Sequence, residues 1–158
     1  HPAAQVAKAV MRLAAAGTGV EVSDGSTNRL PVGDLNEVYE GWQIHAELVG
    51  GALVEGIRQG WDLHPAQLVT RHLVNIAAAR RKVPSALDRL ATYFAATAGG
   101  GAQSADDGAT LDEPATAQAL AADLVRALHL GATTIDEVES RTGVPLERLH
   151  AFAARRVA

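Results

Sequence analysis

Two short polar stretches contain the side chains of this sequence that are best suited to chemistry. In the first, Asp24-Gly25-Ser26-Thr27-Asn28, a carboxylate, hydroxyls and an amide stand beside a glycine. Such a loop can bind an anionic substrate through backbone N–H groups or hold a metal-bound water, and its glycine permits backbone angles that other residues avoid. It can also be an ordinary polar turn whose side chains bond to their own backbone.

The second stretch contains His64-Pro65, with Gln67 following within one turn. A neutral imidazole at this position can donate a hydrogen bond to a substrate carbonyl or carboxylate, or act as an acid or base. The alternative is a structural histidine that bonds to the backbone. His45 falls within a helical pattern, and we interpret it as a packing or surface residue rather than a ligand.

Short candidate strands at residues 20–22 and 61–64 must position these two stretches. Apolar residues at helical spacing predict helices over about residues 2–16, 34–59, 65–82 and 85–96. Asp34 and Glu37 have the spacing of a capping box at a helix start. The order helix, strand, helix, strand, helix is typical of parallel α/β units. In barrels of such units, ligands bind at the carboxyl ends of the strands.

The remaining residues are predicted to form a linker and a helical extension. Residues 97–111 are rich in Gly, Ala, Ser and Asp and are predicted to be flexible. In the extension, residues 112–158, we predict helices at about residues 113–130, 133–141 and 145–156. The last two resemble a helix-turn-helix around Thr142-Gly143-Val144.

A DNA-binding helix-turn-helix needs a basic recognition helix, because attraction to phosphates supplies much of its affinity. Here Arg141, Arg148, Arg155 and Arg156 are balanced by Asp136, Glu137, Glu139 and Glu147. The net charge of the chain is −4. We therefore predict no nucleic-acid binding and no binding to anionic membranes.

Composition excludes several further classes of protein. The chain has no cysteine, which rules out disulfides and thiolate metal sites. No apolar run approaches the roughly 20 residues that span a bilayer, and no signal pattern is present, so we predict a cytoplasmic protein without membrane contact. There is no HExxH motif, so a self-contained metal site is not expected. The opening His1-Pro2 suggests a piece of a longer polypeptide.

Several motifs resemble the last part of the citrate lyase β-subunit / HpcH–HpaI aldolase superfamily. In that superfamily the seventh strand typically ends in Asp-Gly and the eighth in Ile-His-Pro-x-Gln. Here Ser23-Asp24-Gly25 and Leu63-His64-Pro65-Ala66-Gln67 stand in that order, with one long helix between them. The stretches at residues 16–20, 23–28, 60–65 and 111–116 are similar to an uncharacterised aldolase-like branch.

The resemblance implies an α/β fold in which residues 1–96 form the C-terminal part of a (β/α)₈ barrel. This part would be predominantly helical and would contain two short parallel strands. The resemblance also implies a metal-dependent carbon–carbon lyase that acts on a 2-oxo acid or acyl-CoA substrate. Asp24 and His64 would be catalytic, at the mouth of the barrel, positioning substrate or a water. The substrate-binding residues would be Gly25, Ser26, Asn28, Pro65 and Gln67. Asp112 or Glu113 would supply a carboxylate to a neighbouring subunit, as a lid.

The superfamily's cofactor is usually Mg²⁺, but its metal-binding Glu and Asp have no counterpart in this sequence. The chain alone is therefore expected to be inactive, and its partners would be the remainder of the barrel and copies of itself in a homo-oligomer. The alternative is a non-enzymatic helical interaction module whose helix-turn-helix-like end binds a protein or DNA.

Overall fold

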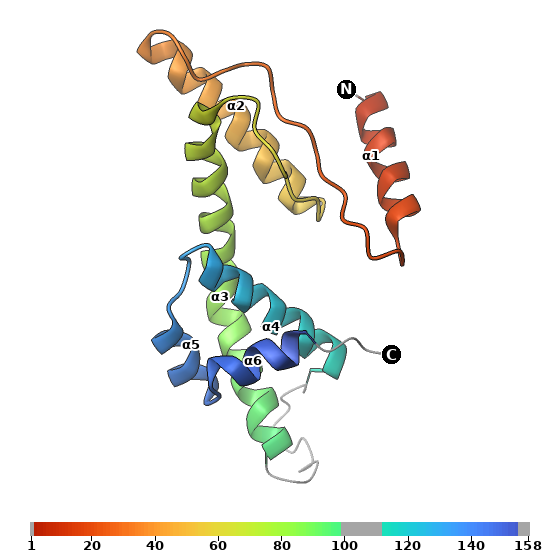
Figure 1. The fold of residues 1–158 in the computed structure, drawn as a ribbon, viewed down its shortest axis with the longest axis vertical. Helices are drawn as coiled ribbons and strands as arrows, with labels where there is room; N and C mark the ends of the chain where they lie inside the picture. The colour runs from red at the N-terminus through yellow and green to blue at the C-terminus, as the bar shows by residue number, and fades with distance from the viewer. Residues whose placement is uncertain (1, 99–111, 155–158) are drawn as a thin grey trace. The chain divides into compact units, whose positions relative to one another are not determined.

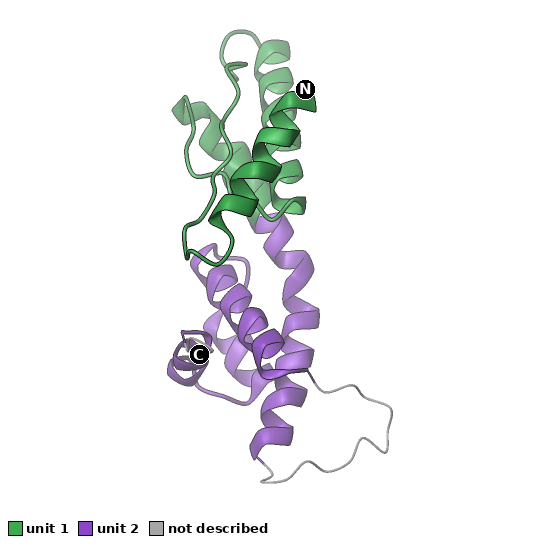
Figure 2. Cartoon of the chain, turned by 90° about the vertical axis from the view of Figure 1, so that its right-hand side faces the viewer, with its two compact units in different colours: residues 1–75 green, residues 76–158 purple. Residues whose placement is uncertain are grey.

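The computed structural model describes residues 2–98 and 112–154, and all regular structure within them is helical. The elements are α1 (Pro2–Ala15), α2 (Leu35–Val54), the short 3-10 helix η1 (Pro65–Gln67), α3 (Leu68–Ala98), α4 (Pro114–His129), α5 (Ile135–Thr142) and α6 (Leu146–Ala153) (Figure 1). The chain divides into two compact units, residues 1–75 (unit 1) and residues 76–158 (unit 2) (Figure 2).

The predicted α/β barrel fragment is wrong, because neither candidate strand forms a strand. Residues 20–22 and 61–62 have no regular structure, and residues 63–64 form a bend. The backbone amides that would build a ladder are bound by side chains instead. Gly60 N donates to Ser23 Oγ at 2.8 Å, and the amides of Leu63 and His64 donate to the Gln67 side chain.

The two segments nevertheless lie side by side and run in the same direction. An ion pair joins Glu21 to Arg58 at 2.9 Å, and Ser23 bonds Gly60 two residues further along each segment. Side chains thus hold the pairing that backbone hydrogen bonds would hold in a parallel sheet.

Local signals placed most helices of unit 1 correctly. The predicted first helix is confirmed as α1. The predicted capping box at α2 is also confirmed, since Asp34 accepts from the amides of Asn36 and Glu37 while Glu37 accepts from Asp34 N. Yet α2 ends at Val54 rather than near residue 59. Gly56 has φ +75° and Ile57 N bonds back to Ala52 O, which is the glycine-terminated helix end.

A close backbone approach in unit 1 requires a glycine in α2. A β-carbon added to Gly41 would lie 2.7 Å from Pro31 Cα, so only glycine lets residues 30–31 pass across the helix. Gly41 therefore marks a point of close packing in α2. Gly51 does not share this role, because nothing lies within 4 Å of its added β-carbon.

The predicted break at Pro84 is also wrong, because α3 continues through it. Proline removes one helical hydrogen bond at a cost of about 3 kcal/mol. Val83, Ala86, Leu87 and Leu90 are buried around it. The apolar area they remove from water offsets that cost.

Unit 2 contains the main apolar core, and its predicted helices are confirmed. Leucine, valine, aromatic and alanine side chains build this core, and they come mainly from α3, α4, α5 and α6. Thr134 caps α5 through Glu137 N, and Gly143 ends it with φ +71°. The chain then turns into α6, which packs on α4 and α5.

The predicted linker at residues 97–111 lies almost wholly outside the described residues. Within residues 2–98 and 112–154, no helix is long and apolar enough to cross a membrane.

Candidate functional site

The side chain of Gln67 joins the two polar stretches that the sequence singled out. Its amide donates to Thr27 O at 2.9 Å, and its oxygen accepts from Ser26 Oγ at 3.1 Å. The same oxygen accepts from the amides of Leu63 at 2.9 Å and His64 at 3.1 Å. Gln67 is fully buried. We call Gln67 with these partners the Gln67 junction.

The fold at His64 fixes which ring nitrogen faces outward. His64 is the N-cap of η1, and its Nδ1 accepts a hydrogen bond from Ala66 N at 3.2 Å. Because Nδ1 is an acceptor, the proton of the neutral ring lies on Nε2. Trp42 Nε1 donates to Ala66 O at 3.0 Å and holds this turn against α2. His64 is half-buried, so its Nε2–H can donate to a small molecule.

Asp24 is held by a lysine that the sequence analysis missed. Lys8 Nζ of α1 lies 2.5 Å from Asp24 Oδ2, and Gly25 N donates to Asp24 Oδ1 at 2.8 Å. The hydrogen bond to Asp24 raises the pKa of Lys8 above its usual value. The signal in the sequence was faint, because one lysine on an exposed helix resembles an ordinary solvated charge.

The other candidate residues divide between the junction and the surface. Ser26 and Gln67 lie in the junction, whereas Gly25, Asn28 and Pro65 are exposed. Gly25 does not adopt the positive φ that its loop suggested. Asp24 and His64 each bond to other partners, and it is the Gln67 junction that joins their segments.

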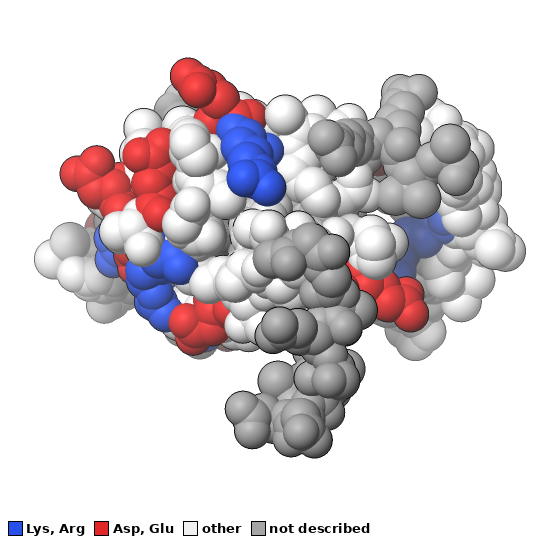
Figure 3. All heavy atoms as spheres, turned by 90° about the horizontal axis from the view of Figure 1, so that it is seen from below, with Lys and Arg blue, Asp and Glu red and all other residues white. Residues whose placement is uncertain are grey.

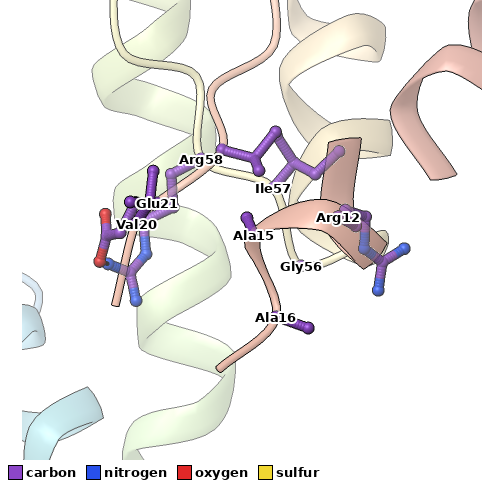
Figure 4. A pocket seen from close by; sticks show the side chains of 9 residues that line it. Arg12, Ala15, Ala16, Val20, Glu21, Gly56, Ile57 and Arg58 are labelled. Carbon is purple, nitrogen blue, oxygen red and sulfur yellow. Dashed lines mark hydrogen bonds and ion pairs between the residues drawn. The ribbon is translucent and has the colours of Figure 1, made fainter. Parts of the chain in front are cut away.

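A cavity in unit 1 lies at the other end of the paired segments. It measures about 260 Å³ and is lined by Arg12, Ala15, Ala16, Val20, Glu21, Val22, Gly56, Ile57 and Arg58. Figure 4 shows Arg58 turned to Glu21, whereas the side chain of Arg12 extends away from this pair. The guanidinium groups do not converge, so the cavity does not form an anion site.

A buried polar cluster behind the junction is the second feature that sequence reasoning missed. His45 is completely buried, with Nδ1 2.6 Å from Thr70 Oγ1 and Nε2 3.2 Å from Gln59 Nε2. Asp62 Oδ1 lies 3.5 Å from His45 Nε2, and Arg71 pairs with Asp62 at 2.9 Å. Helical spacing placed His45 on the apolar side of α2, but it could not show which polar groups surround it.

Burial lowers the pKa of His45 below its usual 6.5, because the charged ring would lose its hydration. The negative charge of Asp62 raises this pKa in part, and Arg71 lowers it further. The ring is therefore neutral near pH 7.

The two proposed lid carboxylates lie in unit 2. Asp112 forms a two-bond ion pair with Arg89, and the hydrogen bond from Arg89 lowers the pKa of Asp112. Glu113 occupies the N-cap position of α4 without a side-chain cap bond. Asp112 is thus ionised and already paired with a cation, and its role as a lid remains a prediction.

The helix-turn-helix-like end carries no free basic face in the described residues. Arg141 pairs with Asp88, and the Arg148 guanidinium lies 5.7 Å from the centre of the Phe94 ring. Figure 3 shows acidic and basic side chains interspersed on the described part of that face. Arg155 and Arg156 lie outside the described residues.

The described residues contain no cluster of side chains that could hold a metal ion by themselves. No group of three or more His, Asp or Glu side chains within residues 2–98 and 112–154 could hold a metal. Both oxygens of Asp24 are engaged, by Lys8 and by Gly25 N.

Comparison with models of protein families gives a match over nearly the whole chain. The model of a family described as a domain of unknown function (DUF6986) matches residues 1–157. Neither a curated protein nor a solved structure shows significant similarity to the chain.

Proposed function

The chain belongs to the DUF6986 family, and we propose that it contributes substrate-positioning residues to a carbon–carbon lyase for 2-oxo acids or acyl-CoA thioesters. The proposal rests on the ordered motifs that resemble the citrate lyase β-subunit / HpcH–HpaI superfamily. The two motifs are Ser23-Asp24-Gly25 and Leu63-His64-Pro65-Ala66-Gln67.

The Gln67 junction is the observation that carries this proposal. A fully buried amide ties the Asp24 loop to the His64 turn across 40 residues of chain. Ordinary polar turns are closed by their own local hydrogen bonds. A buried cross-link between the second motif and the residues that directly follow the first supports a shared function for them.

His64 would act as a hydrogen-bond donor. Its Nδ1 is occupied by Ala66 N, which leaves Nε2–H for a substrate carbonyl or carboxylate oxygen. When the bond next to a carbonyl breaks, negative charge develops on that oxygen. A donor already oriented toward it stabilises the charge. Asp24, fixed by Lys8, would accept a hydrogen bond from a hydroxyl group of the substrate or orient a water molecule.

The cation of such a lyase, Mg²⁺, would have to be bound by carboxylates outside this chain. When bound, it would supply charge stabilisation at the enolate oxygen. We therefore expect this chain to bind 2-oxo acids weakly and to catalyse no cleavage by itself.

A titration with pyruvate, and with oxalate as an enolate mimic, tests this function. We expect the amide NMR signals of residues 24–28, 63–64 and 66–67 to shift together and saturate at one concentration. His64→Asn should weaken binding by roughly ten- to 150-fold, because a hydrogen bond to a charged group contributes about 1.5–3 kcal/mol. Asparagine is a good N-cap, so η1 should persist.

His72→Asn is the matched control, since His72 is exposed on α3 in the same unit. Shifts confined to other residues, or an unchanged affinity in His64→Asn, would refute the lyase proposal.

The apolar surface of unit 1 favours a second candidate, a helical interaction module. All the exposed large apolar side chains of the described residues, except Ile135, belong to unit 1. Val6, Val10 and Leu13 form one such stripe on α1, with exposed fractions of 63%, 59% and 79%. A stripe of this kind marks a contact surface.

Sedimentation velocity over a hundredfold concentration range tests whether the chain associates through this surface. Self-association that is abolished by Val10→Glu would favour the interaction module.

A further inference from the structure

We propose that His45 is a pH-sensitive latch on the Gln67 junction, closed when its ring is neutral and released when the ring is protonated. This proposal rests on the proposed function in one respect only: a role of the released junction in substrate binding. The latch itself can be tested without any ligand.

The first step is the connection between His45 and the junction. His45 Nδ1 lies 2.6 Å from Thr70 Oγ1, and that hydroxyl donates its proton to Gln67 O at 3.0 Å. A hydroxyl has one proton to give. With that proton on Gln67 O, His45 donates to Thr70 from Nδ1, and this is the tautomer that the proposal assigns to the closed state. The backbone of Gln67 is thereby held by His45 through one hydroxyl.

The second step is the position of Nε2, which is an acceptor in the neutral ring. The amide of Gln59 donates to it at 3.2 Å. Protonation places a second N–H there, facing the Gln59 donor. The acceptor within reach is Asp62 Oδ1, at 3.5 Å. Protonation therefore breaks the bond to Gln59 and pulls Nε2 toward Asp62.

The third step is the charge of the buried cluster. Asp62 comes from the segment before η1 and Arg71 from α3, and these are the charged groups that act on His45. Thr70 and Gln59, its other polar contacts, are neutral. Asp62 is already paired with Arg71, so a protonated His45 would leave one uncompensated positive charge at a site with no exposure. Burying such a charge is costly, and an open state that hydrates the ring avoids the cost.

The sign of the effect follows from linkage. In the closed state the pKa of His45 lies below 6.5, whereas in an open, hydrated state it has its usual value. The open state therefore binds more protons as the pH falls below 6.5. The ratio of open to closed molecules should rise by up to about tenfold per pH unit, until the closed-state pKa is reached.

Hydrogen exchange at Trp42 provides the test, because its Nε1–H donates to Ala66 O beside the junction. We expect the protection factor of this proton to be nearly constant from pH 8 to 7 and to fall by up to about fivefold between pH 6.5 and 5.5. Trp61→Phe assigns the signal. In His45→Asn the fall should vanish, because asparagine can donate to Thr70 but does not titrate.

His72→Asn, an exposed histidine of the same unit, should retain the fall. An unchanged fall in His45→Asn, or constant protection in the wild type, would overturn the latch. If His45→Asn does not fold, NMR of the wild-type His45 ring provides the test. We expect the ring proton on Nδ1 at pH 7.5, and we expect the ring to titrate over the same pH range in which the Trp42 Nε1–H loses its protection. A proton on Nε2 at pH 7.5 would overturn the proposal. Neither result depends on whether pyruvate binds.

Discussion

At the scale of single residues, Gln67 is the side chain on which the site depends most. Sequence reasoning placed it near His64 and expected it to touch substrate. The structure buries it and directs its amide to Thr27, 40 positions earlier. Local spacing could predict the nearness to His64, because both lie in one turn. It could not predict the bond to Thr27, which depends on how two distant segments pair.

Gln67→Ala should destabilise unit 1 by about 1–3 kcal/mol, because it leaves Thr27 O and the amides of Leu63 and His64 without their partner. Both tryptophans of the chain, Trp42 and Trp61, lie in unit 1, so urea unfolding followed by tryptophan fluorescence reports its stability.

Gln43→Ala is the control, since Gln43 is exposed on α2 and pairs only with Glu47. It should change stability by less than about 0.5 kcal/mol. Equal effects of the two substitutions would show that the junction does not form in solution.

At the scale of elements, the sequence predicted helices well and strands badly, for a physical reason. Helix ends are marked by local signals, such as the capping box at Asp34 and the glycine at 143. A strand needs a neighbour. The contacts next to the two candidate strands join Glu21 to Arg58 and Ser23 to Gly60 through side chains, without a backbone ladder. The early end of α2 was readable in principle, because Gly56 can take the left-handed conformation that terminates a helix.

Gly41→Ala and Gly51→Ala should act in opposite directions, although both lie in α2. Alanine favours a helix by about 0.5–1 kcal/mol relative to glycine, so Gly51→Ala should stabilise unit 1 by that amount. Gly41→Ala forces a methyl group against Pro31 and should destabilise it by about 1–3 kcal/mol. Thermal unfolding followed by tryptophan fluorescence measures both. Stabilisation by Gly41→Ala would contradict the close approach of residues 30–31.

At the scale of the whole molecule, the two units differ in how many of their large apolar side chains are buried. Unit 2 buries its leucines and aromatic rings in one core, whereas unit 1 exposes most of its large apolar residues. The composition of the chain, with 4% aromatic residues, does not show that the core gathers in residues 76–158.

Leu124→Ala should lower the stability of unit 2 by about 2–5 kcal/mol, because Leu124 is 1% exposed. Leu73→Ala should cost less than about 0.5 kcal/mol, since Leu73 is 63% exposed. Urea unfolding followed by circular dichroism measures both. A large cost for Leu73→Ala would mean that another molecule covers this surface of unit 1 in solution.

The most direct measurement of the central claim is an NMR contact between the two motifs. The Gln67 side-chain NH₂ lies against Thr27 O, so its protons should show nuclear Overhauser effects to the amides of Thr27 and Asn28 and exchange slowly with water. The amides of Leu63 and His64 donate to the side-chain oxygen of Gln67, so their protons should also show nuclear Overhauser effects to the Gln67 side chain. A fast-exchanging Gln67 amide without contacts to residues 26–28 would contradict the joined site.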